Sequence, residues 1–413
     1  MKKMIAMILV FSMTLVLASC GGTTNSENIT EDVTAEKIET GEIEMTDTDS
    51  ALRFAADLFK ASYQDGKNTL VSPFSVMVAL AMTANGADGE TLEQMEEVLG
   101  MPKDELNGYL ASYIASLPEG EGYKLRPANS IWLTDDERFT VSEDFLKTNK
   151  SVYDADIFRT PFDESTKNDI NSWVREKTDG MIPEILKEIP DAAIMYLVNA
   201  LAFDAEWGEI YNEDQVHSAE FTREDGTKEK TELMYSEEWA YLETDNATGF
   251  LKYYKDGKYA FCAILPEEGI KMADFIDSLD GEKLCDILKS LRTETVYAAI
   301  PKFETRSSFE LSGVLKGMGM PLAFDMAKAD FSKLGDSDAG NIFIGRVIHE
   351  TFISVAEQGT KAGAATVVEM LDGGAPFMET PKVDTLDRPF VYAIIDTETL
   401  TPVFLGTLMS TAQ

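Results

Sequence analysis

Apolar positions at helical spacing characterise the first half of the chain. Ser50 is placed to cap a helix whose buried face would carry Leu52 and the apolar residues that follow it at helical spacing. A second helix is expected to open at Ser72-Pro73, with proline in its first turn, and to run to about Ala84. Both helices are therefore predicted from a start signal and a face that agree.

Two further helices follow from the same kind of signal. Thr91 and Gln94 have the spacing of a capping box, and Gly100 is the expected end of that helix. Ile170 marks the apolar face of another helix, which is expected to stop near Gly180.

Long apolar runs dominate the second half of the chain and predict strands. The candidates are residues 195–203, 259–265, 296–303, 341–356, 390–395 and 403–408, with a hairpin turn at 396–401. Several runs are apolar on both faces, as central strands are. Helices grouped early and strands grouped late predict an α+β fold with large, covered sheets.

Residues 351–382 combine an apolar strand, a string of small residues and a loop rich in glycine and proline. Small residues make a poor core, and a long loop in a compact domain is usually functional or disordered. Because apolar strands flank this loop, we expect it to be held at both ends and displayed.

The segment 360–369 has a period of two that separates charge by face. The uncharged face would be formed by small or β-branched residues: Thr360, Ala362, Ala364, Thr366 and Val368. Lys361 and Glu369 fall on the other face. The stretch could therefore enter the middle of a sheet with its uncharged face towards the core. A small-residue linker is the alternative, and the pattern alone leaves both open.

The first residues are expected to be a targeting signal. Lys2 and Lys3 precede an apolar run over residues 4–17, which is short for a membrane span. The sequence Leu-Ala-Ser-Cys resembles the bacterial lipoprotein processing box, which implies that residues 1–19 are removed and Cys20 is lipidated. The alternative is an ordinary signal peptide with an incidental cysteine.

Residues 20–49 are rich in acidic and small polar residues and lack aromatic residues, which predicts a disordered tether after the lipidated cysteine. Anchor and tether would hold the folded part outside the cytoplasm, at the surface of a bacterial membrane. Residues 50–413 show no repeat or linker, so we expect one domain. We also expect the protein to be a monomer.

The charge and the cysteines exclude several classes of function. The net charge is −37, from 36 basic and 73 acidic residues. This argues against a nucleic-acid partner, because phosphate binding needs basic patches. Three cysteines without a CxxC pair give no support to a zinc or redox function. Cys262 and Cys285 are expected to be separate buried residues.

Common enzyme motifs are absent from the sequence. His217 and His349 are the two histidines, and neither belongs to an H-E-x-x-H site. There is no G-x-S-x-G elbow and no P-loop. His349 lies in an apolar stretch and is expected to be a hydrogen-bonded core residue. We therefore expect no enzymatic activity, no metal site and no cofactor.

A series of motifs in a fixed order carries a family resemblance. They are Asn68-Thr69-Leu70-Val71-Ser72-Pro73-Phe74-Ser75, Leu197-Val198-Asn199-Ala200, Ala329-Asp330-Phe331-Ser332, Glu357-Gln358-Gly359-Thr360, Asp387-Arg388-Pro389-Phe390 and Phe404-Leu405-Gly406. Each motif is weak alone, but in this order they resemble the serpin (serine protease inhibitor) family over essentially residues 50–413.

The resemblance implies the serpin fold, with helices packed on large, mainly antiparallel sheets and an exposed reactive loop. It also implies suicide-type inhibition of extracellular serine proteases, with cysteine proteases as a further class. The protease would cut the loop and form an acyl-enzyme, and the cut loop would insert into the main sheet and trap it. A non-inhibitory binding protein on the same fold is the alternative.

The resemblance further assigns roles to individual residues. The hinge of the loop would comprise Glu357, Gly359, Thr360, Ala362, Ala364 and Thr366. Hydrogen bonds would hold the region where the sheet opens, through Ser72, Ser75, Asn199 and His349, with Trp207 at the top of the sheet. The hinge has no proline and no core-facing charge, which favours an inhibitor.

Two spacings place the reactive bond differently. Counted forward from Glu357, the family spacing puts it at about Gly373-Gly374, or one residue earlier between Asp372 and Gly373. Counted back from Pro389, it falls near Met378-Glu379, so this loop is several residues longer than in the best-known relatives. We prefer the forward count, because the inserted length determines how far the protease is carried.

The loop composition limits the target proteases. No Lys or Arg lies between Lys361 and Lys382, which argues against trypsin-like targets. Apolar residues such as Leu371 would suit elastase-, chymotrypsin- or subtilisin-like pockets, and Asp372 would suit a protease that prefers an acidic residue.

Overall fold

The computed structural model describes residues 26–412 except 39, 42, 118–122, 190–194, 256, 339 and 361–380. The longer helices lie in the first half of the chain, and shorter ones follow in the second half. They are α1 (Met45–Ser62), α2 (Pro73–Ala84), α3 (Gly89–Leu99), α4 (Lys103–Ala115), α5 (Glu143–Tyr153), α6 (Glu164–Lys177), α7 (Met272–Asp277), α8 (Gly281–Lys289), α9 (Ser312–Met318) and the 3-10 turns η1 (Glu213–Gln215) and η2 (Leu322–Phe324).

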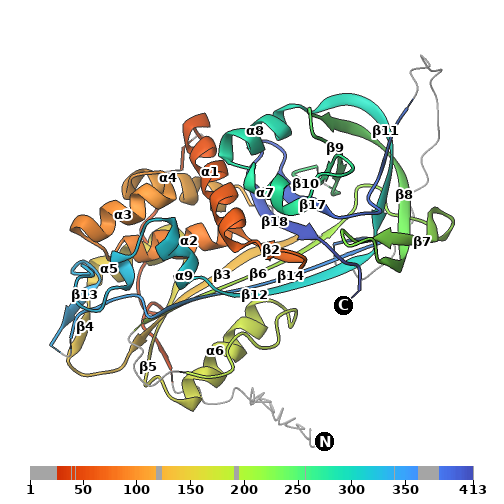
Figure 1. Ribbon diagram of the computed structural model, residues 1–413. Coiled ribbons are helices and arrows are strands. Elements are labelled where there is room, and N and C mark those ends of the chain that lie inside the picture. Colours follow the sequence, from red (N-terminus) through yellow and green to blue (C-terminus); the bar gives the residue numbers. More distant parts are fainter. Residues whose placement is uncertain are drawn as a thin grey trace, which may run out of the picture.

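A seven-stranded mixed sheet, here called the main sheet, runs through the middle of the molecule (Figure 1). Its strand order is β1 (Glu27–Asn28), β5 (Asp156–Thr160), β3 (Tyr123–Thr134), β6 (Met195–Glu206), β15 (Gly359–Thr360), β14 (Arg346–Ala356) and β12 (Phe303–Glu310). The pairs β3–β5 and β6–β14 are parallel, and the other pairs in this sheet are antiparallel.

A second, nine-stranded sheet follows a path through distant parts of the chain. It is made of β16 (Lys382–Thr385), β11 (Arg292–Pro301), β8 (Lys228–Glu243), β9 (Ala247–Tyr253), β10 (Tyr259–Pro266), β17 (Phe390–Asp396), β18 (Pro402–Leu408) and β2 (Thr69–Val71), with β7 (Val216–Thr222) beside β8. A small pair joins β13 (Gly335–Ser337) to β4 (Phe139–Val141).

The main sheet is covered on both faces. Its strand β6 accordingly has apolar side chains on both of its faces. Leu197 and Leu201 belong to the large core cluster that includes residues of α2. Tyr196 and Val198 point the other way and pack in a separate cluster with Ile170 of α6. Figure 1 shows α6 alone on one side of the sheet and α1 to α5 on the other.

Helix α2 begins at Pro73 as predicted, and the Ser72 hydroxyl oxygen accepts a hydrogen bond from the Ser75 N–H. Helix α1 begins before Ser50, at Met45. Helix α3 is capped by Asp88, so the capping box predicted at Thr91 and Gln94 is wrong.

Thr91 and Gln94 serve contacts between segments instead. The Thr91 hydroxyl accepts from the N–H of Asp330, and the Gln94 amide oxygen accepts from the N–H of Leu322. Both side chains therefore bond to residues that are distant in the sequence, whereas the local pattern predicted that they would cap the helix. The end of α3 is as predicted, with Gly100 in a left-handed conformation.

The predicted strands are present, with shifted ends. The run predicted from residue 341 forms a strand only from Arg346 onward, and the run at 296–303 contains the end of β11 and the start of β12. The hairpin of β17 and β18 is confirmed. Cys262 and Cys285 are both buried and free, as expected.

The described part of the predicted tether is ordered. Glu27–Asn28 pairs with β5, and Thr30 is fully buried, with its hydroxyl donating to the Ala155 carbonyl at 2.8 Å. Ser26 donates twice to the Asp169 carboxylate. The expected disorder is therefore wrong for residues 26–38, because a few specific hydrogen bonds outweigh a composition typical of disorder. Cys20 and the signal sequence lie outside the described residues.

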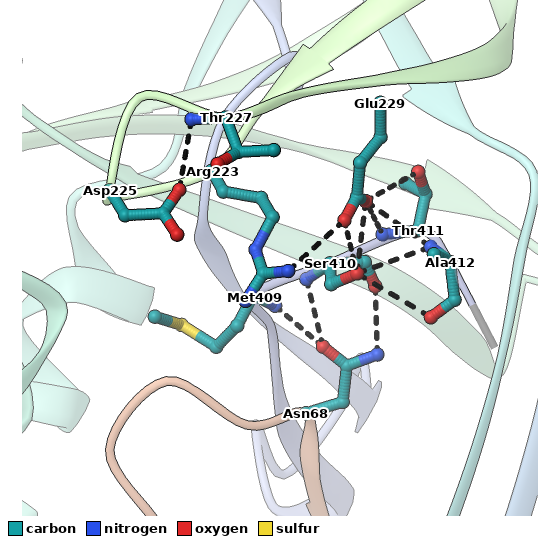
Figure 2. A network of polar contacts seen from close by, with 9 residues as sticks. All are labelled: Asn68, Arg223, Asp225, Thr227, Glu229, Met409, Ser410, Thr411 and Ala412. Carbon is teal, nitrogen blue, oxygen red and sulfur yellow. Dashed lines mark hydrogen bonds and ion pairs between the residues drawn. The ribbon is translucent and has the colours of Figure 1, made fainter.

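The end of the chain is clamped between two segments (Figure 2). Asn68, just before β2, accepts the N–H groups of Met409 and Ser410 at 2.7 and 3.0 Å. The Glu229 carboxylate of β8 accepts the N–H groups of Thr411 and Ala412 at 2.8 and 3.2 Å. These bonds hold the residues that follow β18 against the second sheet.

Within the part of the chain that the structure describes, no helix is long and apolar enough to span a membrane.

Candidate functional site: the hinge and the opening of the main sheet

The hinge begins as a short strand at the top of the main sheet. Gly359 lies opposite Ala356 of β14 and Glu206 of β6, and Thr360 continues the same two antiparallel pairings. Gly359 has a φ of 147°, and a Cβ added there would lie 2.1 Å from the Ala205 carbonyl oxygen. Only glycine fits this position, which explains the glycine in the hinge motif.

Below the hinge, the two neighbouring strands are joined directly. Strand β14 pairs in parallel with β6 from Arg346 opposite Tyr196 to Phe352 opposite Ala202. The strand β15 therefore sits in a fork between them. A longer strand could continue down the fork only if the β6–β14 pairing opened.

Aromatic side chains hold the hinge in the fork. Thr360 is fully buried, and its hydroxyl is 2.6 Å from the hydroxyl of Tyr254. The Tyr254 ring stacks on Trp207, with centroids 4.5 Å apart. The Trp207 indole N–H donates to the Ala356 carbonyl at 2.9 Å, and its backbone N–H donates to Gln358. Trp207 thus braces the turn between β14 and β15.

Glu357 is the charged residue of this turn. Its carboxylate accepts a bond from the Lys302 ammonium at 2.7 Å, and Lys302 also pairs with Glu232 at 2.9 Å. Partial burial raises the pKa of Glu357, but the Lys302 hydrogen bond and charge outweigh it, so the pKa lies below its usual value. The turn is therefore pinned by a charge pair as well as by Trp207.

A buried polar network crosses the line along which β6 and β14 would part. His349 of β14 lies directly opposite Asn199 of β6. The His349 Nε2 accepts the Ser72 N–H at 3.0 Å, so Nδ1 carries the proton and donates to the Asn199 amide oxygen. Burial lowers the pKa of His349 to about 3, which keeps the ring neutral.

The Asn199 amide group extends the network into α2 and β3. Its Nδ2 lies 2.7 Å from the Ser75 hydroxyl and 2.5 Å from the Asn129 amide oxygen. Ser75 also donates to Asn129 at 3.5 Å. Four segments thus converge on one buried point, and parting β6 from β14 there requires the His349–Asn199 bond to break.

The structure brings Ser72, Ser75, Asn199 and His349 together, and it places Trp207 separately, beside the hinge. Glu357, Gly359 and Thr360 form the turn and the seated strand. The remaining predicted hinge and reactive-bond residues lie outside the described residues: Ala362, Ala364, Thr366, Leu371, Asp372, Gly373 and Gly374.

The family model described as serpin (serine protease inhibitor) matches residues 49–411. The chain belongs to the serpin family. Serpins are typically protease inhibitors rather than enzymes.

Relatives of this serpin span most of its length. A serpin-like protein of Thermococcus kodakarensis is 34% identical over 366 residues, covering 86% of this chain and 84% of the relative. The human leukocyte elastase inhibitor is 29% identical over 380 residues, covering 87% and 97%.

Solved structures agree on the fold. The native state of the thermophilic serpin tengpin matches with a TM-score of 0.89 at 45% identity, covering 94% of this chain and all of that one. The latent state of tengpin matches with a TM-score of 0.80 at 44% identity over 91% of this chain. This serpin is thus more similar to the native form than to the latent one.

Sequence reasoning missed three residues of the site. Asn129 completes the buried network, Tyr254 bonds to Thr360, and Lys302 pairs with Glu357. Asn129 lies in a strand of mixed composition, so its burial beside Asn199 follows only from the order of strands in the sheet. Tyr254 and Lys302 carry no signal in the sequence either, because their partners come from distant segments.

Proposed function

We propose that this serpin is a suicide-type inhibitor of extracellular serine proteases. The protease serine would attack the carbonyl carbon at the reactive bond, near Gly373-Gly374, releasing the amine of the following residue and leaving an acyl-enzyme. The freed loop would then enter the main sheet and carry the protease with it. Cysteine proteases, which also form acyl-enzymes, are a further target class.

One observation supports this function above the others: the hinge already forms the first residues of the additional strand. Gly359 and Thr360 are paired on both sides, and the uncharged face predicted for the hinge begins with the fully buried Thr360. Insertion would therefore extend a strand that is already paired on both sides, and would not have to form its first strand pairs anew.

The energetics favour insertion once the loop is cut. An inserted strand pairs with both neighbours, whereas only the single β6–β14 pairing is lost. Roughly ten net ladder bonds at about 1 kcal/mol each would rival the 5–15 kcal/mol stability of an ordinary domain. The uncut protein is then held kinetically by the loop ends and by the buried network.

We further propose elastase-, chymotrypsin- or subtilisin-like proteases as targets, since the segment between Lys361 and Lys382 holds no basic residue. Lipidation of Cys20 would hold the inhibitor, as a monomer, at the outer surface of a bacterial membrane. The short apolar run before Cys20 supports this placement.

The test is a denaturing gel of residues 26–413 incubated with subtilisin, pancreatic elastase and chymotrypsin. We expect a covalent band at the summed mass that survives SDS, with trypsin as the control that forms none. Cleavage of the loop without such a band, for every protease, would contradict inhibition and favour the non-inhibitory binding protein.

A further inference from the structure

Four large apolar side chains lie exposed on one face of the second sheet. Trp239 is 58% exposed, Tyr297 49% and Val383 72%, and Tyr235 is also exposed. We call this set the aromatic face. Isolated exposed apolar residues are normal, but a contiguous group marks an interaction site.

Strand register shows that the four side chains are neighbours. Tyr297 of β11 is opposite Val383 of β16 on one side and opposite Glu237 of β8 on the other. Tyr235 and Trp239 lie two residues either side of Glu237, so all three point to the same face. The alternate residues of β8 point inward, and Met234 and Glu238 are buried.

The local geometry also presents Trp239 outward. The register of β8 and β11 shifts between Thr293 and Val296, which leaves Trp239 opposite the bulge rather than a single partner. Bulges commonly redirect side chains at functional surfaces. On the far side, the exposed His217 ring packs 5.5 Å from Tyr235 and extends the face onto β7.

Glu237 places one negative charge in the centre of the aromatic face. It is exposed and forms no ion pair with any residue that the structure describes. A partner should therefore offer an apolar surface with a Lys or Arg opposite Glu237. This charge disfavours a lipid surface, and a two-fold contact with a second copy would bring the two Glu237 carboxylates close together.

The face is continuous with the end of the proposed reactive loop. Strand β16, which carries Val383, begins at Lys382, two residues after the segment 361–380. Nine residues separate Gly374 from Val383, so the chain between them reaches at most about 30 Å. A protease of about 200 residues has a radius of gyration of about 16 Å and is about 40 Å across. A protease seated on the loop can therefore overlie this face.

We propose that the aromatic face is a second docking surface for the protease that cleaves the loop. This inference rests on the proposed function and adds a determinant of target choice that lies outside the loop. Trp239 and Tyr297 are the expected anchors, since Trp and Tyr dominate binding energy at protein interfaces. Glu237 would speed the approach of proteases with a basic surface.

The experiment compares Trp239→Ser combined with Tyr297→Ser against the wild type, using the protease that forms the covalent band. We expect the second-order rate constant of complex formation to fall about tenfold, with an unchanged stoichiometry of inhibition. Glu237→Arg should lower the rate constant several-fold, and more at low salt than at high salt. Met326→Ser is the matched control, since Met326 is 68% exposed but lies just after η2, outside the second sheet.

A second measurement tests binding of the protease without cleavage of the loop. Binding of the same protease with its nucleophilic serine replaced by alanine should weaken in the double variant and not in the control. Double-variant rate constants within twofold of the wild type would overturn the docking surface and leave inhibition standing. A wild type without any covalent band would overturn both proposals.

Two further measurements test whether the aromatic face instead binds lipid or a second copy of the chain. Loss of binding to phosphatidylglycerol vesicles, or loss of self-association in sedimentation, with unchanged rate constants, would assign the face to lipid or to a second copy and overturn the proposal.

Discussion

His349 makes the stability of the folded protein depend on pH. The ring is neutral and bonded on both nitrogens in the folded protein, with its pKa lowered by burial to about 3 from the ordinary value of 6.5. Because the histidine pKa is lower in the folded protein, the unfolded chain binds a proton at a pH where the folded protein does not. The stability from this site is therefore complete above pH 6.5 and is lost as the pH falls from 6.5 towards 3.

We expect the free energy of unfolding to drop by about 1 kcal/mol per pH unit below 6.5 because of His349. The measurement is urea unfolding between pH 7.5 and 5, for the wild type and for His349→Gln. The variant should be less stable at pH 7.5 but should lack this part of the slope. Parallel pH profiles would contradict the assignment.

Thr360 tests the face that enters the sheet. Its side chain is fully buried beside Tyr254, so an arginine there would place a charge in the core. Thr360→Arg should abolish the covalent band and turn the inhibitor into a substrate. Lys361→Glu, on the opposite face of the predicted strand, should change the yield of complex less than twofold. Equal effects of both changes on the gel would refute the face assignment.

At the scale of elements, the sequence predicted helix ends correctly where the bonds that form the end lie within one helical turn. Ser72-Pro73 and Gly100 placed a helix start and a helix end correctly, because their partners lie within one turn. The same reasoning failed at Thr91 and at the N-terminal segment, where distant partners decide. The network at His349 was predictable only in part, since the role of Asn129 depends on how strands are ordered in the sheet.

The clamp on the end of the chain offers a test of an element that no motif predicts. Glu229→Ala removes the acceptor for the N–H groups of Thr411 and Ala412, at a cost of about 1–2 kcal/mol. Carboxypeptidase Y should then trim the last residues faster, as read by mass spectrometry. Glu220→Ala is the control, because Glu220 pairs with the exposed Lys228 on the adjacent strand. Equal trimming of both variants would show that the clamp is dispensable.

At the scale of the whole molecule, the proposed function requires the fork between β6 and β14 to store the energy of an unfilled strand. Cutting the loop should release this energy. About ten new hydrogen bonds at about 1 kcal/mol each would add about 10 kcal/mol of stability. At about 2 °C per kcal/mol, the Tm should rise by about 20 °C. Calorimetry before and after loop cleavage measures this. Cleaved Thr360→Arg is the control and should show no rise, and an unchanged Tm in the wild type would mean that no strand enters.

The clamped end of the chain also bears on how the molecule is made. Strand β18 lies between β17 and β2, so the second sheet joins residues from the first fifth of the sequence to its last residues. Residues 402–408 are synthesised long after those of β2, so β2 lacks its partner strand in this sheet until they have left the ribosome. The second sheet therefore stays incomplete until this late part of the chain has been made.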